Sequence, residues 1–140
     1  MIWKKDYEIG IDIIDQQHQE IFQYISNFIA ITQGISDRKE KLDQIKESMT
    51  FIKESITAHL EMEETYQEKM SYPNIEQHKK VHAQFKKELS YYINLCEKQK
   101  LDVIKSQEFG TKLMTWLIMH ICQMDQEIGQ YIKCQKGILK

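Results

Sequence analysis

Residues 42–63, LDQIKESMTFIKESITAHLEME, carry an unbroken helical pattern that decides the fold. Inward positions recur in alternating steps of three and four, and they are occupied by Leu42, Ile45, Met49, Ile52, Ile56, His59 and Glu63. That spacing is typical of a helix packed along one seam in a bundle. The seam begins with apolar residues and ends with a histidine and a glutamate. The stretch therefore predicts a helix whose buried face carries polar groups at one end.

Three further segments show the same periodicity. They span about residues 12–32, the stretch after Tyr72-Pro73, and about residues 106–130. No pair of alternating apolar runs around a tight turn predicts a hairpin of strands. Short loops between long helices favour antiparallel neighbours. The sequence therefore predicts an all-α fold, an up-down-up-down antiparallel four-helix bundle, with an N-terminal extended arm of about eleven residues.

Length and composition limit the class of protein. A chain of 140 residues fits one domain, so residues 1–140 are predicted to form a single unit. The net charge of -2, with acidic and basic residues interspersed, argues against nucleic acid as a partner. No run approaches the roughly 20 apolar residues of a membrane span, and the first residues lack the apolar region of a signal peptide. Three cysteines without a CxxC pair favour a reducing, cytoplasmic location, with Cys96, Cys122 and Cys134 as packing or surface residues.

All five histidines fall on inward positions of the predicted helices, and two acidic residues lie four and five positions after a histidine. The set is His18, His59, Glu63, His78, His82, His120 and Asp125. A single inward histidine is usually a hydrogen-bonded core residue. Burial of all seven groups without compensation would be very costly, whereas a shared metal would satisfy them together. The pattern therefore predicts a buried metal site.

The spacing of the last pair is unusual for a helix. Asp125 stands five residues after His120, which rotates it about 140° beyond one full turn. Either Asp125 reaches sideways to join the site, or the helix is locally distorted.

The donor set restricts the metal. Seven donors exceed the four that a single zinc ion needs, and the zinc-protease pattern HExxH is absent because Lys79 follows His78. The paired Glu-x-x-His motifs of ferritin-like di-iron proteins are absent too. Imidazole nitrogens suit iron, zinc or copper rather than calcium or magnesium.

Four motifs in order resemble those of the bacterial hemerythrin family. They are IGIDIIDQQH at 9–18, HLEMEE at 59–64, Tyr72-Pro73 with His78 and His82, and WLIMHI at 116–121 with Asp125. The resemblance spans Trp3 to about Tyr131. Leu60 and Ile128 depart from the usual phenylalanine and tyrosine, and neither is a ligand in the family.

The resemblance implies a non-haem di-iron centre that binds dioxygen reversibly for carriage, storage or delivery. It implies that His78, His82 and His120 hold one iron, and that His18 and His59 hold the other. Glu63, Asp125 and an oxo or hydroxo group would bridge the two iron ions, and one open coordination position would remain on the second iron. By the same resemblance Leu117 lines the oxygen pocket, with Trp116 and Phe22 as further walls, although all three are equally expected as bundle core.

Two other function classes stay open. One is an enzyme, such as a peroxidase, an oxidase or a nitric oxide-handling di-iron oxidoreductase. No further inward acid or base is apparent for cleaving an O–O bond, which argues against an enzyme. The other is an oxygen or redox sensor. Sensor domains of this family are usually fused to signalling modules, but residues 131–140 could form an interaction tail, and a protein partner that receives oxygen or electrons is conceivable.

Overall fold

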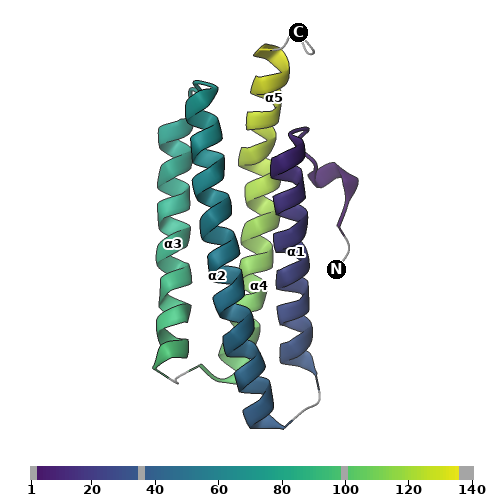
Figure 1. The fold of residues 1–140 in the computed structure, drawn as a ribbon, viewed down its shortest axis with the longest axis vertical. Helices are drawn as coiled ribbons and strands as arrows, with labels where there is room; N and C mark the ends of the chain where they lie inside the picture. Colours follow the sequence, from purple (N-terminus) through teal and green to yellow (C-terminus); the bar gives the residue numbers. More distant parts are fainter. Residues whose placement is uncertain (1–2, 35–36, 99–100, 136–140) are drawn as a thin grey trace.

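The computed structural model describes residues 3–34, 37–98 and 101–135, and within them the chain is helical and contains no strand (Figure 1). The long helices are α1 (Asp12–Gln33), α2 (Arg38–Lys69), α3 (Ile75–Glu97) and α4 (Val103–His120). A π-helical turn (Ile121–Asp125) joins α4 to α5 (Gln126–Gln135), and a 3-10 turn (Lys5–Tyr7) lies in the N-terminal arm. The predicted antiparallel four-helix bundle is confirmed.

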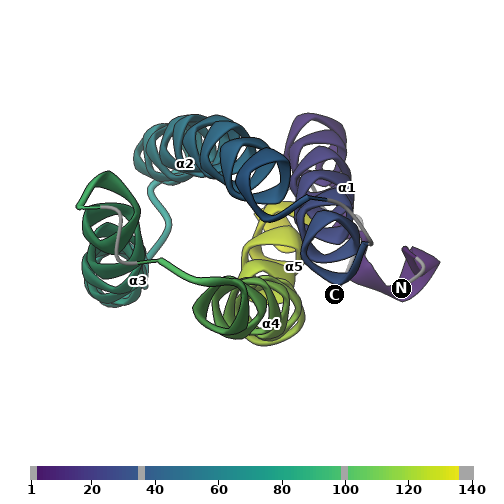
Figure 2. The ribbon, with the colours of Figure 1, turned by 90° about the horizontal axis from the view of Figure 1, so that it is seen from below.

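The helices pack unevenly around the bundle (Figure 2). Helix α1 packs closely on α2 and on α4, and α3 packs on α2. The α1–α4 approach needs Gly110, because a Cβ there would lie 2.8 Å from Cγ1 of Ile29. Helices α3 and α4 meet mainly through long side chains instead, such as the ring pair of Tyr92 and Phe109, whose centroids lie 4.8 Å apart. The wider α3–α4 contact leaves room for large rings between these helices.

The seam of residues 42–63 is buried as predicted from Ile45 to Glu63, whereas Leu42 is only partly buried. Ile45, Met49, Ile52 and Ile56 are each 1% exposed, and they pack with apolar side chains from the other helices. On α4 the buried stripe passes through Leu113 and Leu117, whereas Trp116, also expected as a core residue, is only partly buried. Trp116 faces the wide side of the bundle towards α3, so it is not covered completely.

The N-terminal arm is fixed to the end of the bundle that carries α5. The carboxylate of Asp15 accepts hydrogen bonds from the backbone N–H groups of Ile9 (2.7 Å) and Gly10 (3.1 Å). The arm lies so close to α5 that a Cβ on Gly129 would come within 2.0 Å of the Ile9 carbonyl oxygen. Only glycine at position 129 allows this approach.

The fourth helical segment is longer than predicted, since it begins at Val103 and runs through α5 to Gln135. It begins early because the side chain of Asp102 accepts a hydrogen bond of 2.7 Å from the Lys105 N–H and so caps the helix. Of the predicted tail at 131–140, residues 136–140 lie outside the described part of the chain. None of the helices in the described residues is both long and apolar enough to cross a membrane.

Candidate metal centre

The seven donor side chains meet in one half of the bundle. Helix α1 supplies His18, α2 supplies His59 and Glu63, α3 supplies His78 and His82, α4 supplies His120, and the π-helical turn supplies Asp125. Each is at most 4% exposed. Their donor atoms fall into two clusters that share Glu63.

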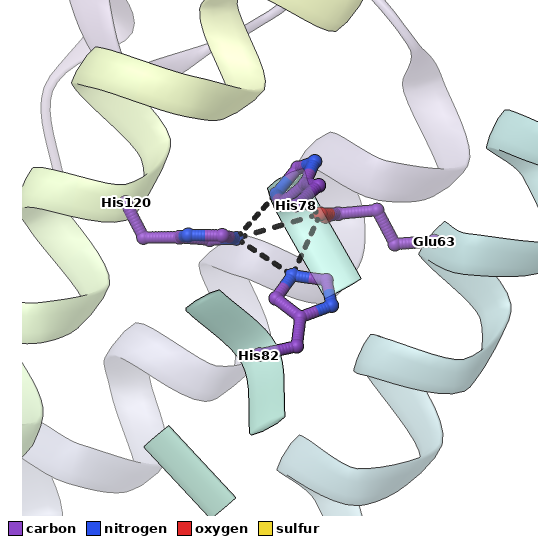
Figure 3. Close-up of side chains that lie close together, drawn as sticks. All are labelled: Glu63, His78, His82 and His120. Carbon is purple, nitrogen blue, oxygen red and sulfur yellow. Dashed lines mark hydrogen bonds and ion pairs between the residues drawn. The ribbon is translucent and has the colours of Figure 1, made fainter. Parts of the chain in front are cut away.

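The first cluster contains three histidines and is drawn in Figure 3. The Nε2 atom of His120 lies 3.1 Å from Nε2 of His78 and 3.1 Å from Nε2 of His82. One oxygen of Glu63, Oε1, lies 3.1 to 3.4 Å from these three nitrogens. Four donor atoms from α2, α3 and α4 therefore surround one small space.

The second cluster contains two histidines. The Nε2 atom of His59 lies 3.1 Å from Oε2 of Glu63, and Nε2 of His18 lies 2.9 Å from Oδ2 of Asp125. The two imidazole rings meet edge to face, with centroids 4.7 Å apart. This cluster thus has one imidazole fewer than the first.

Each carboxylate divides its oxygens between the clusters. Glu63 directs Oε1 to the three-histidine cluster and Oε2 to His59. Asp125 directs Oδ1 to His78 (3.1 Å) and His120 (3.2 Å), and Oδ2 to His18. A carboxylate with one oxygen on each side is the arrangement that can bridge two cations.

The distances fit metal ligation. Two nitrogens that bind one ion at about 2.1 Å and at right angles lie about 3.0 Å apart, close to the separations in the first cluster. Within the described residues, His18 Nε2, Glu63 Oε2 and both oxygens of Asp125 are buried and lie close to one another or to other imidazole nitrogens, yet none of these contacts has the geometry of a hydrogen bond. Buried polar atoms are rarely left in this state unless an ion or water satisfies them. The donor set therefore fits two metal ions.

Asp125 reaches the site because the helix is distorted. Residues Ile121–Asp125 form a π-helical turn, in which the Gln126 N–H bonds to the Ile121 carbonyl five residues earlier. This wider turn brings positions five apart onto one face, so Asp125 lies on the same side as His120. Of the two alternatives that the sequence left open, local distortion is confirmed.

The charges of the site favour cations. Burial lowers the pKa of His18 and of His120, but Asp125 and Glu63 outweigh burial and raise these pKa values to about 9 and about 10. Burial acts to raise the pKa of Glu63, yet the histidines hold it well below its usual range. His82 differs, because burial, assisted by the neighbouring histidines, lowers its pKa. Two charged carboxylates inside the bundle therefore attract either protons on imidazoles or metal cations.

Two side chains that contact the outer Nδ1 atoms of the imidazoles were not predicted from the sequence. Gln17 Oε1 lies 2.7 Å from Nδ1 of His59, and the fully buried amide of Gln67 contacts Nδ1 of His78. Gln67 could have been found, because it continues the step of four from His59 to Glu63. With a metal at Nε2, the His59 imidazole carries its proton on Nδ1 and donates it to Oε1 of Gln17, whereas the Gln67 atom beside Nδ1 of His78 is the amide nitrogen. Gln17 then fixes which nitrogen of His59 faces the metal.

The three predicted pocket residues lie in different surroundings. Leu117 is 1% exposed, one turn before His120 on α4. Trp116 stacks on His120, a member of the three-histidine cluster. Phe22 is buried against the arm, where Trp3 and Tyr7 pack on it with ring centroids 5.5 and 6.3 Å away. The three cysteines form no disulfide in the described structure, and Cys122 and Cys134 are exposed.

Comparisons with family models, with known sequences and with solved structures all indicate the same family. Residues 9–132 match the family model of the hemerythrin HHE cation binding domain. A bacteriohemerythrin of Stenotrophomonas maltophilia is 32% identical over 95% of this chain and 82% of its own length. One from Clostridium acetobutylicum is 29% identical over 90% of this chain and 96% of its own length. A crystal structure of wild-type hemerythrin superimposes with a TM-score of 0.83 at 20% identity, covering 94% of this chain and 97% of that one.

Proposed function

The chain belongs to the hemerythrin family, and we propose that it binds dioxygen reversibly at two iron ions held by its seven donor side chains. One observation carries the proposal. The carboxylates of Glu63 and Asp125 each direct one oxygen to a cluster of three imidazoles and the other to a cluster of two. This arrangement suits a bridged pair of metal ions with unequal numbers of protein ligands. The family resemblance, which implies non-haem iron, supports iron as the metal.

A pair of ferrous ions in such a site supplies the electrons that dioxygen takes up on binding and gives back on release. The residues decide where dioxygen enters. Because the cluster of His18 and His59 has one imidazole fewer, a metal ion there would have one protein ligand fewer, and a small ligand could bind on that side of the carboxylates. Leu60 and Ile121 adjoin ligands in sequence, Leu117 lies one turn before His120, and all three are buried, which would exclude water from this half of the bundle.

The set of buried ionisable side chains supports a binding protein rather than an enzyme. Every buried histidine or acidic residue in the described part of the chain belongs to the seven donors. None is left over as an acid or base that could help to break an O–O bond. Glu64 contacts the outer nitrogen of His82 at 3.6 Å and is 20% exposed, so it faces away from the donors. We therefore propose carriage, storage or delivery of oxygen, without turnover.

The test is stopped-flow mixing of the reduced, iron-loaded protein with oxygen, followed by removal of oxygen. We expect about two iron ions per chain, and an absorption band that appears with oxygen and disappears on degassing through several cycles. Loss of the band within one cycle, with oxygen consumed continuously in the presence of a reductant, would indicate an enzyme instead. A reconstituted protein that retains no iron would contradict the proposed site as well.

A further inference from the structure

The imidazoles of the site are held in different ways on the side away from the donor clusters. Gln17 and Gln67 contact the Nδ1 atoms of His59 and His78, and Glu64 approaches Nδ1 of His82. Such outer contacts normally orient a histidine that binds a metal. Within the described residues, the Nδ1 atoms of His18, His82 and His120 are buried and have no hydrogen-bond partner. His120 is therefore one of three histidines without the usual anchor, and it is the one that an indole covers.

An aromatic column lies against His120 instead. The Trp116 ring is parallel to the His120 imidazole, with centroids 4.7 Å apart and an interplanar angle of 10°. The Trp116 ring also stacks on Phe85 of α3, with ring centroids 3.5 Å apart and an interplanar angle of 13°. The imidazole is thus held by its face and not by its edge. Phe85 prevents the indole from sliding away.

We propose that Trp116 is the positioning residue of His120, and that its indole takes the place of the outer side-chain contact that His59 and His78 receive. A stack fixes the plane of the imidazole, because rotation of that ring would drive it into the indole. The electron-rich face of an indole also favours positive charge above it, and an imidazole that donates to a metal cation is electron-poor. Trp116 therefore stabilises His120 in its metal-bound form.

The column also spans the widest contact of the bundle. Phe85 follows His82 by three residues on α3, and Trp116 precedes His120 by four on α4. The stacked rings thus tie the helix of His82 to the helix of His120 where the two backbones do not pack closely. Trp116 lies beside the three-histidine cluster, so this role differs from the oxygen-pocket wall that the sequence resemblance implies. The inference rests on the metal site of the proposed function and does not depend on oxygen binding.

The first test is the rate at which a chelator removes zinc or iron from the loaded protein. Trp116→Leu removes the stack, and we expect the metal to leave about 10 to 100 times faster, the range seen when outer partners of metal ligands are lost. Trp116→Phe keeps an aromatic face, so its rate should return to within a few-fold of the wild-type rate. Met119→Ala, a half-exposed residue next to His120, is the matched control and should change nothing.

A second, spectroscopic test does not depend on metal release. The chain has two tryptophans, so Trp3→Phe leaves Trp116 as the only one. Zinc is not redox-active, and its binding should change the Trp116 emission because the charge on the stacked imidazole changes. In Trp116→Phe, where Trp3 remains against Phe22, the emission should stay constant.

The outcomes separate this inference from the proposed function. The inference would be overturned if Trp116→Leu released its metal at the wild-type rate, or if Trp116→Leu and Trp116→Phe released it equally faster than the wild type. It would also be overturned if metal binding left the Trp116 emission unchanged. If Trp116→Leu does not fold, Phe85→Leu removes only the outer ring, and a wild-type release rate there would overturn the inference. Normal metal retention without reversible oxygen binding would overturn only the proposed function, whereas a wild-type protein that binds no metal would overturn both.

Discussion

The two halves of the bundle are built on the same helical seams but are stabilised differently. In one half, Ile45, Met49 and Ile52 of α2 face Phe28 and Phe109 in a closely packed apolar core. In the other half, the continuation of the α2 seam through His59 and Glu63 faces imidazoles and a second carboxylate. The apolar half is stable through burial alone. The polar half buries charged groups that only protons or a metal can compensate. The polar half therefore depends on a bound ligand, and the apolar half does not.

The largest effect should come from the residue that both clusters share. Glu63→Gln keeps the size of the side chain but removes its charge, so we expect metal affinity to fall by more than about 100-fold, beyond the loss of an outer partner. Glu61→Gln, an exposed residue on the same helix, is the matched control. The measurement is iron per chain after gel filtration. Two retained iron ions in Glu63→Gln would show that the carboxylate does not hold them.

The metal-free polar half should respond strongly to pH. Folding raises the pKa of His18 from 6.5 to about 9, and that of His120 from 6.5 to about 10. These two histidines bind more protons in the folded state than in the unfolded state between these limits. Their contribution to the free energy of unfolding is therefore complete below pH 6.5 and is lost as the pH rises to about 10, whereas the contribution of the Glu63 and Asp125 carboxylates, whose pKa values folding lowers, is lost only in strong acid. Urea unfolding of the metal-free protein at several pH values checks this. The metal-loaded protein should lose its extra stability at acid pH instead, because protons compete with the metal for imidazoles. A metal-free protein equally stable across this range would contradict the assignment.

A cavity in the apolar half should destabilise the protein but leave the metal site intact. Ile52→Ala removes a side chain that is 1% exposed, and a cost of about 2 to 5 kcal/mol in the free energy of unfolding is expected. Ile104→Ala, at 76% exposure, should cost less than about 0.5 kcal/mol. Urea unfolding gives the cost, and metal analysis should find the wild-type iron content in both variants. Loss of iron from folded Ile52→Ala would mean that the two halves are not separable.

The smallest effect concerns an outer partner of the two-histidine cluster. Gln17→Leu removes the acceptor for His59 Nδ1, so we expect metal affinity to fall by about 10-fold. Gln16→Leu, exposed and adjacent, serves as the control. Competition with a coloured chelator measures both variants. Equal affinities would show that the Gln17 amide does not orient His59.

The helices and the donors could be predicted because both depend on local periodicity. The step of three and four from Leu42 to Glu63 fixes which side of one helix is buried, whatever the helix packs against. For the same reason, the five histidines and Glu63 could be predicted to face inward. The five-residue step to Asp125 left open a sideways reach or a local distortion, since no regular α-helix brings positions five apart onto one face.

Only the tertiary structure decided what meets between helices. The angular position along one helix does not set how neighbouring helices are shifted and spaced, so periodicity could not place Glu63 with one oxygen in each cluster, and only the family resemblance implied a bridge. Periodicity also could not show that the wide α3–α4 contact leaves the Trp116 indole partly exposed and stacked on both Phe85 and His120. The periodicity of each helix thus determined the donors, and the spacing between helices decided how those donors are divided and held.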